Sequence, residues 1–245
     1  DDEPTETTED EEAAPVDNCP TDEAIQIGWI PWDEDIAVTW LWDALLTEQG
    51  YEVEQTQLEV GPLYTGLANG DLHLFLDAWL PETHGSYWED YGDQIEDLGV
   101  WNDSATLHLT VPEYTGLTSI EELADNADDF DNQIVGIEAG AGIMEAAGER
   151  AMPDYELEDD FDLVESSTPA MLTELDSAVE AEEPIVVTLW HPHWAYDAYD
   201  LVDLEDPQGS MGEGENINVV GCEGFTEANP EIAEWMNNFE LTSEE

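Results

Sequence analysis

The chain has 245 residues and carries 64 Asp and Glu against a single Lys or Arg, which gives a formal net charge of −63 at pH 7. This charge excludes nucleic acid and anionic lipid as electrostatic partners, because counterion release needs Lys and Arg. Carboxylates at such a density repel one another in dilute buffer, whereas molar salt shortens the Debye length to about 3 Å. We therefore expect a protein adapted to high salt, as from a halophile.

The rest of the composition predicts a folded chain. Apolar residues make up 41% of the sequence and ten residues are Trp, which disordered acidic segments lack. The length allows one or two domains with a sizeable core. No apolar run reaches the roughly 18 residues expected of a membrane span.

Residues 1–22 are acidic, with interspersed Thr and Pro and few apolar side chains. This composition favours an unpacked stalk, and we expect it to tether an exported protein to the extracellular face of the cell membrane. Cys19 and Cys222 form the only possible disulfide pair. A disulfide fits an exported protein, and two free thiols remain the alternative.

Short apolar runs alternate with amphipathic ones from Ala24 onward, which is the rhythm of a sheet covered by helices. Strands are predicted at Ile25–Ile30, Tyr51–Leu58, Leu72–Ala78, Leu107–Val111, Ile134–Glu138, Phe161–Glu165, Ile185–Leu189 and Ile217–Val220. Helices are predicted at Glu34–Glu48, Leu63–Asn69, His84–Ile95, Ile120–Asp128, Ile143–Met152, Pro169–Glu182 and Pro230–Phe239.

The pattern predicts an α/β protein with two lobes, each a mixed sheet flanked by helices. Pro and Gly interrupt the pattern near 111–114 and 206–212, where the chain is expected to cross between lobes. Residues 23–111 and 208–245 then form lobe 1, and residues 112–207 form lobe 2. One long sheet is the alternative. Thr242 and Glu245 have capping-box spacing with no helix behind them, so we expect the fold to continue past the last residue.

Three Trp-bearing segments each lie at the carboxyl end of a predicted strand. They contain Trp32, Trp79 and Trp190, each close to a Pro. Ligands of open α/β sheets bind outside the carboxyl ends of strands, so these rings can converge on one crevice. Indole faces attract cations, and quaternary ammonium is the favoured guest. A single Trp is more often core packing, so the hypothesis depends on the set of three.

A fourth segment, 134–144, has the pattern of a strand, a Gly turn and a helix start. The free backbone N–H groups at such a helix terminus can bind an anion without a basic side chain. Arg150 is the only basic side chain of the chain, so a bound carboxylate needs backbone amides and neutral donors. Glu145 stands at the third Gly position of a dinucleotide fingerprint and would repel a pyrophosphate, which argues against a nucleotide cofactor.

Among the five His residues, His84 opens a predicted helix five residues after Trp79 and can donate to the same carboxylate. A first-turn surface His is the alternative. His191 and His193 flank Pro192, a spacing that suggests a metal, but no third ligand is clustered with them, so no metal site is predicted. His73 and His108 fall in strands and are assigned no role.

The sequence contains no recognisable catalytic motif. Carboxylates are so frequent that a glycosidase-like pair carries no information, and neither a nucleophile elbow nor a supported Cys-His pair occurs. Acidic runs such as 156–160 lack the ligand spacing of a calcium loop. We expect no enzyme and no cofactor. A carboxylate-based hydrolase and a calcium-binding surface module remain the alternatives from other classes.

Several long segments together resemble the glycine betaine substrate-binding proteins of ABC importers, which have the type II periplasmic-binding-protein fold. The resemblance spans about Ile25 to Phe239. Its motifs occupy residues 32–37, 70–84, 136–144, 171–178, 186–194 and 204–207.

The resemblance implies that Trp32, Trp79 and Trp190 box a trimethylammonium group, while the Gly142 and Ile143 amides bind the ligand carboxylate with His84. It also implies permease subunits in the membrane as partners, and osmoprotection as the role. Choline, proline betaine and carnitine remain alternative ligands.

Overall fold

The computed structural model describes residues 19–21 and 24–241. Within them the strands follow the order β2-β1-β3-β9-β4-β7-β5-β6, and β8 pairs with β4. The predicted stalk and the predicted C-terminal capping box lie almost entirely outside the described residues. In the described part, no helix is both long enough and apolar enough to cross a bilayer.

The strand bounds are β1 Ile25–Trp29, β2 Val53–Gln57, β3 Leu74–Leu80, β4 Ile95–Pro112, β5 Gln133–Val135, β6 Asp162–Val164, β7 Val186–His191, β8 Leu201–Asp203 and β9 Glu215–Cys222. The α-helices are α1 Asp33–Gln49, α2 Val60–Asn69, α3 Gly85–Tyr91, α4 Gly142–Glu145, α5 Met152–Asp154, α6 Thr168–Ala181, α7 Ala195–Ala198, α8 Phe225–Ala228 and α9 Pro230–Asn237. Short 3₁₀ segments occupy Gly92–Gln94, Glu113–Thr115, Ile120–Glu122 and Ala124–Phe130, and a π-helical turn at Ala146–Ala151 joins α4 to α5.

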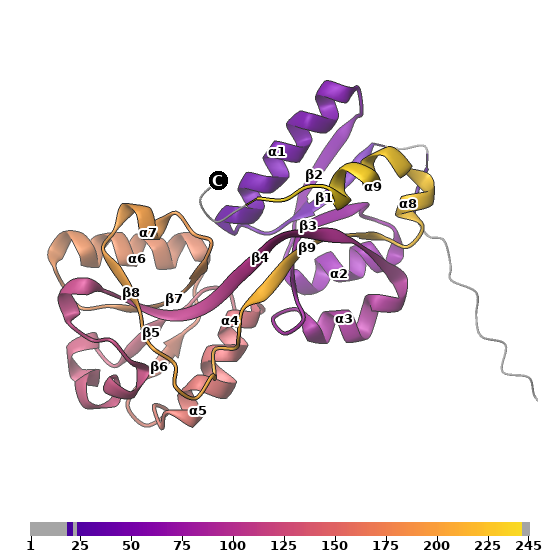
Figure 1. Ribbon diagram of the computed structural model, residues 1–245. Coiled ribbons are helices and arrows are strands. Elements are labelled where there is room, and N and C mark those ends of the chain that lie inside the picture. Colours follow the sequence, from indigo (N-terminus) through magenta and orange to yellow (C-terminus); the bar gives the residue numbers. More distant parts are fainter. Residues whose placement is uncertain (1–18, 22–23, 242–245) are drawn as a thin grey trace, which may run out of the picture.

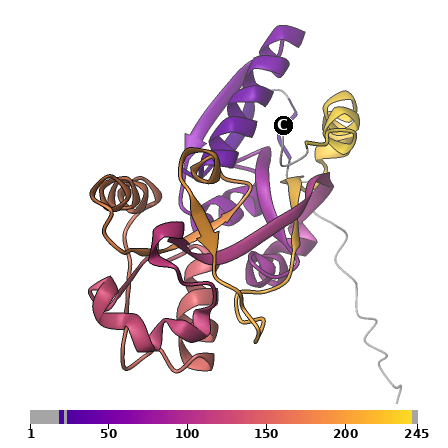
Figure 2. The same cartoon turned by 60° about the vertical axis from the view of Figure 1, so that its left-hand side comes forward.

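The molecule has two lobes, and the long strand β4 runs from one to the other (Figures 1 and 2). Residues Ile95 to Ala105 of β4 pair with β9, whereas Thr106 to Thr110 pair with β7. The pairing partner therefore changes within a single strand. We call the part built on β1, β2, β3 and β9 lobe 1, and the part built on β5 to β8 lobe 2; the residue limits proposed above for the lobes stay a prediction.

Parallel pairing places the carboxyl ends of neighbouring strands, and the loops that follow them, on the same side of each sheet. In lobe 1, β1 pairs in parallel with both β2 and β3. In lobe 2, β5 pairs in parallel with β6 and β7. The carboxyl ends of β1 and β3 thus lie at one edge, those of β5 and β7 at another, and helices cover the faces of both sheets (Figure 1). The residues that follow these four strands are the candidates for a binding site.

The predicted two-lobed α/β architecture is confirmed, and several elements differ in detail. The segment predicted as a helix at 120–128 consists of 3₁₀ turns, and the helix predicted from His84 ends at Tyr91. The N-terminal half of β4 was not predicted, because acidic and polar residues interrupt its alternation and its pairing with β9 shifts register three times. The short elements β8, α7 and α8 were also missed.

Cys19 and Cys222 form a disulfide, with a Cα–Cα distance of 5.3 Å across 203 residues of sequence. The backbone N–H of Cys19 also donates to the carbonyl of Glu223 at 3.2 Å. The pairing that the sequence left open is therefore resolved in favour of the disulfide, which fastens the start of the described chain to the end of β9.

Candidate functional site

One small cavity lies between the two lobes and is lined largely by the segments that follow strands. Its walls come from Trp32 after β1, Trp79 and Thr83 from β3 and the turn after it, Leu107 of β4, the segment 137–143 after β5, and Trp190 of β7. All three Trp side chains are buried, with exposed fractions of 3–4%. The structure therefore brings the three predicted rings to one cavity rather than to separate sites.

Each indole has a different polar environment. The Trp32 N–H donates to Oε1 of Glu138 at 2.9 Å, and the Trp79 N–H donates to Oδ1 of Asp77 at 3.2 Å. The Trp190 N–H is buried and has no hydrogen-bond partner of normal geometry. Two of the rings are thus fixed in place by buried or half-buried carboxylates, which holds their faces at defined angles around the cavity.

Gly142 and Ile143 line the cavity opposite the turn that contains Thr83. They begin α4, and Ala141 before them provides no side-chain cap. The first N–H groups of a helix have no partner within it, so these amides are available to an acceptor. A Cβ on Gly142 would come within 2.5 Å of the Thr83 carbonyl, so only Gly allows the two lobes to approach this closely.

His84 is fully buried directly behind this site rather than among the residues that line the cavity. Its ring stacks on Trp32, with 5.7 Å between centroids and 20° between planes. The Trp79 backbone N–H donates to Nδ1 at 3.0 Å, so in the neutral ring the proton resides on Nε2. Nε2 is buried without a partner, and burial lowers the pKa of His84 to about 3. His84 is therefore a neutral donor with an unused N–H.

Glu34 is a lining residue that sequence analysis missed. Its side chain is 9% exposed and neither oxygen has a hydrogen-bond partner of normal geometry. Burial raises its pKa to about 8, although the nearby Trp190 indole opposes the shift. Once ionised, this carboxyl group beside three indoles adds negative potential to a cavity that already suits a cation. With 64 acidic residues in the chain, only its position two residues after Trp32 could have singled it out.

Two further carboxylates lie close behind Glu34. Burial raises the pKa of Asp35 to about 7, and Asp35 accepts hydrogen bonds from the Ile30 N–H and the Thr39 hydroxyl. Burial, together with Glu34 and Asp35, also raises the pKa of Asp77 well above its usual range. One lining carboxyl group, that of Glu34, is therefore backed by two buried carboxyl groups that do not line the cavity, and burial favours the protonated form of all three.

Side-chain contacts between the lobes surround the cavity. The Trp32 indole donates to Glu138, as described above. Nε2 of His193 lies 3.2 Å from Oδ2 of Asp33. Nη1 of Arg150 lies 3.6 Å from Oε2 of Glu82. His193 is thus occupied by a carboxylate of lobe 1 and does not form a site with His191. These contacts hold the lobes together over the cavity, as expected of a closed form.

Comparison with known proteins places this geometry in a family. Residues 23–245 match the model of the substrate binding domain of ABC-type glycine betaine transport systems. The chain is similar to lactococcal OpuAC in its closed-liganded conformation complexed with glycine betaine, with 34% sequence identity and a TM-score of 0.84. This match covers 91% of this chain and 86% of that chain. It is also similar to the glycine betaine/L-proline-binding protein ProX from Borrelia burgdorferi, with 30% sequence identity and a TM-score of 0.85. This match covers 91% of this chain and 83% of that chain.

Among curated relatives, the glycine betaine/carnitine transport binding protein GbuC of Listeria monocytogenes is 39% identical over 132 residues, which cover 54% of this chain and 44% of that protein. An uncharacterized protein ORF1 of Chromohalobacter salexigens is 36% identical over 101 residues, which cover 39% of this chain and 64% of that protein. The chain thus spans less than two thirds of the length of these relatives.

Proposed function

Because the chain belongs to the family of substrate-binding domains of ABC-type glycine betaine transport systems, we propose that it captures glycine betaine, or a related quaternary-ammonium osmolyte, outside the cell and delivers it to a membrane permease. One observation carries this proposal: Trp32, Trp79 and Trp190, which come from both lobes, are buried around one cavity. The role is osmoprotection, and the chain catalyses no reaction in it.

The ammonium end of the ligand lies among the indole faces. A methylated ammonium cannot donate hydrogen bonds, so leaving water costs it little, and each ring contributes about 0.5–2 kcal/mol. The buried carboxyl of Glu34, whose pKa burial raises to about 8, ionises beside the bound cation and then supplies a negative charge on the same cavity wall. Charge and π faces together favour a permanent cation over an uncharged osmolyte of similar size.

The carboxylate end lies at the start of α4. The Gly142 and Ile143 amides donate to it, and the partial positive charge of the helix terminus adds to their attraction. His84 does not line the cavity, and we propose that its buried Nε2–H becomes the third donor when the ligand binds, because its ring is neutral and its other nitrogen is engaged by Trp79. Neutral donors suit this ligand, since a zwitterion brings its own positive charge to the indole end.

Capture by closure of the lobes follows from the placement of the donors. The Trp32 and Trp79 rings and His84 belong to lobe 1, whereas Trp190 and the α4 amides belong to lobe 2. A ligand that contacts both sets stabilises the closed form over the open one. The closed form is then the one that docks on the permease at the extracellular face of the membrane.

The experiment that tests the proposal is titration calorimetry with glycine betaine in about 1 M KCl, where the Debye length is about 3 Å. We expect one site per chain and a change in Trp fluorescence. Carnitine, proline betaine and choline, tested in parallel, establish the preferred ligand. Proton NMR of the recovered ligand must show it unchanged, because a carboxylate-based hydrolase would return products. Absence of heat and of any fluorescence change for all four compounds contradicts the proposal.

A further inference from the structure

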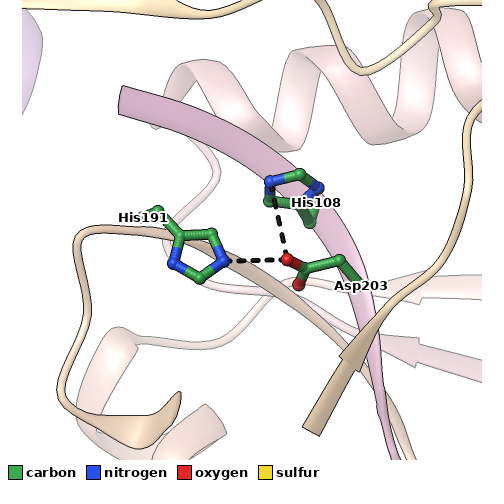
Figure 3. Close-up of side chains that lie close together, drawn as sticks. All are labelled: His108, His191 and Asp203. Carbon is green, nitrogen blue, oxygen red and sulfur yellow. Dashed lines mark hydrogen bonds and ion pairs between the residues drawn. The ribbon is translucent and has the colours of Figure 1, made fainter. Parts of the chain in front are cut away.

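Outside the betaine cavity, two imidazoles and a carboxylate meet on lobe 2. Figure 3 shows His108, His191 and Asp203 with their side chains turned toward one another. They come from three adjacent strands, β4, β7 and β8 respectively. Their ligand atoms all lie within 4.8 Å of one another, and within the described residues no other group of three His, Cys, Asp or Glu side chains meets this condition.

Strand register explains how residues so far apart in the sequence meet. Thr106 of β4 lies opposite His191, and Thr110 of β4 lies opposite Asp203. His108 stands between these two positions on the same face, because side chains two residues apart in a strand point the same way. The three side chains therefore share one face of the sheet, and their meeting is built into its backbone pairing.

The distances suit a metal ion bound by three protein ligands. Nε2 of His191 lies 2.8 Å from Oδ2 of Asp203, and Nε2 of His108 lies 3.7 Å from the same oxygen. Ligands about 2.0–2.1 Å from a tetrahedral Zn²⁺ are about 3.3 Å apart, so the two observed values bracket the required spacing. Nε2 of His108 now lies 2.8 Å from the Thr106 hydroxyl, and a small rotation of its ring away from this partner would admit the ion.

The carboxylate is already oriented for such a role. Oδ1 of Asp203 accepts hydrogen bonds from the Tyr196 hydroxyl at 2.6 Å and the Thr110 hydroxyl at 2.9 Å. Oδ2 is left to the two imidazoles. Outer hydrogen bonds of this kind typically fix the ligands of metal sites. The site is also reachable from solvent, since the side chains of His108, His191 and Asp203 are 24%, 36% and 26% exposed.

We propose that His108, His191 and Asp203 form a binding site for a divalent transition-metal ion, with Zn²⁺ as the best-suited probe. Two imidazole nitrogens and one carboxylate oxygen are a ligand set for Zn²⁺ and its neighbours, whereas Ca²⁺ and Mg²⁺ prefer oxygen ligands alone. Three protein ligands leave a fourth position for water. Because its ligands come from three adjacent strands, the ion would act as a structural link between them.

The site lies on the far side of the strands that wall the betaine cavity. Leu107 and Trp190 are paired across β4 and β7 and line that cavity, whereas their neighbours His108 and His191 point to the opposite face. A bound ion would clamp β4, β7 and β8 together without touching the osmolyte. The inference is therefore independent of the proposed function, and its test needs no betaine.

The test is Zn²⁺ titration calorimetry of the full chain, stripped with chelator and free of any His tag, in about 1 M KCl to screen general attraction to the carboxylates. We expect one ion per chain and a rise in melting temperature, since an ion that binds only the folded form stabilises it. His108→Gln, His191→Gln and Asp203→Asn should each weaken binding at least tenfold. Asp200→Asn, which changes an exposed carboxyl three residues away, should leave binding intact.

A spectroscopic readout separates this site from diffuse binding. Co²⁺ in place of Zn²⁺ should give the intense visible bands of a four- or five-coordinate ion in the native chain and lose them in His191→Gln. Absence of binding to the native chain would mean that the three side chains form a hydrogen-bonded cluster only. If binding persists in all three ligand variants, the ions are bound by surface carboxylates. The same conclusion follows if Asp200→Asn weakens binding as much as the ligand variants do. Each of these outcomes overturns the proposal.

Discussion

The indole N–H of Trp32 and the carboxylate of Glu138 are joined by a 2.9 Å hydrogen bond that links lobe 1 to lobe 2. The other oxygen of Glu138 accepts from the backbone N–H of Thr168 at 3.0 Å, so the carboxylate is fixed from its own lobe. Because Trp32 also walls the cavity, this one bond ties the orientation of an indole face to the closed position of the lobes.

Replacement of Glu138 by Ala should weaken glycine betaine binding about 3- to 10-fold, since one hydrogen bond of the closed form contributes roughly 0.5–1.5 kcal/mol. Calorimetry measures the affinity, and small-angle scattering should show a more open ligand-free chain. Glu165→Ala removes an exposed carboxylate from the same lobe and serves as the control. An unchanged affinity in Glu138→Ala would show that this bond does not contribute to closure.

The buried carboxyl of Glu34 should make betaine binding depend on pH. Burial raises its pKa to about 8 in the ligand-free chain, and a cation beside it favours the ionised form. The pKa falls on binding, so affinity should rise between pH 6 and pH 9, about tenfold for each unit by which the ligand lowers the pKa. Titrations at several pH values, and in buffers with different ionisation enthalpies, measure the slope and the released proton.

Two variants test the assignment of this pH dependence. Glu34→Gln keeps the size of the side chain and should remove most of the slope, with weaker binding above pH 8. Asp77→Asn removes the neighbouring carboxyl, whose pKa is also raised by burial. If Glu34→Gln keeps the full slope and Asp77→Asn loses it, Asp77 is the titrating group and the role given to Glu34 is wrong.

Glu34 should also set a pH dependence of folding stability. Its folded pKa of about 8 lies above the ordinary value of 4.5, so the folded chain holds a proton that the unfolded chain releases. This stability is fully present below about pH 4.5 and is lost as pH rises toward 8. Denaturant unfolding without ligand should show a smaller loss across this window in Glu34→Gln than in the native chain. Equal losses would mean that Glu34 does not remain protonated in the folded chain.

The Trp positions illustrate what local sequence patterns predict well. Strand ends can be located from apolar runs and Pro, and the carboxyl ends of strands are where α/β sheets bind ligands. Trp32, Trp79 and Trp190 were expected at one site on this basis, and they lie around one cavity. The Gly turn before α4 was recognised in the same way, since a helix start after a strand is a local pattern.

Features that depend on strand register could not be predicted. His108 and Asp203 are 95 residues apart and meet only because β8 pairs with the end of β4. The sequence shows neither β8 as a strand nor that pairing, so the only metal pair it suggested was His191 with its neighbour His193. The importance of Glu34 was hidden for another reason: its burial cannot be inferred from a run of three acidic residues at the start of a helix.

Replacement of His84 should affect ligands that have a carboxylate more than ligands that lack one. His84→Ala removes the proposed Nε2–H donor and should weaken glycine betaine binding roughly 10-fold or more, since hydrogen bonds to charged groups contribute about 1.5–3 kcal/mol. Choline has no carboxylate, so its affinity should change little. The pKa of about 3 keeps the ring neutral from pH 5 to 9, so this difference should not vary with pH. Equal losses for both ligands would mean that His84 only supports Trp32, on which it stacks.

The net charge of −63 predicts a strong dependence of stability on salt. Repulsion among the carboxylates acts over a Debye length of about 10 Å at 0.1 M salt but only about 3 Å at 1 M, so KCl should stabilise the compact chain. We expect the melting temperature to rise by about 10 °C or more between these concentrations, which for a chain of this size corresponds to a few kcal/mol. Sorbitol at equal osmolality controls for preferential exclusion, which also favours burial. If sorbitol raised the melting temperature as much as KCl, charge screening would not be the cause, and the acidic surface would have to be explained by something other than adaptation to salt.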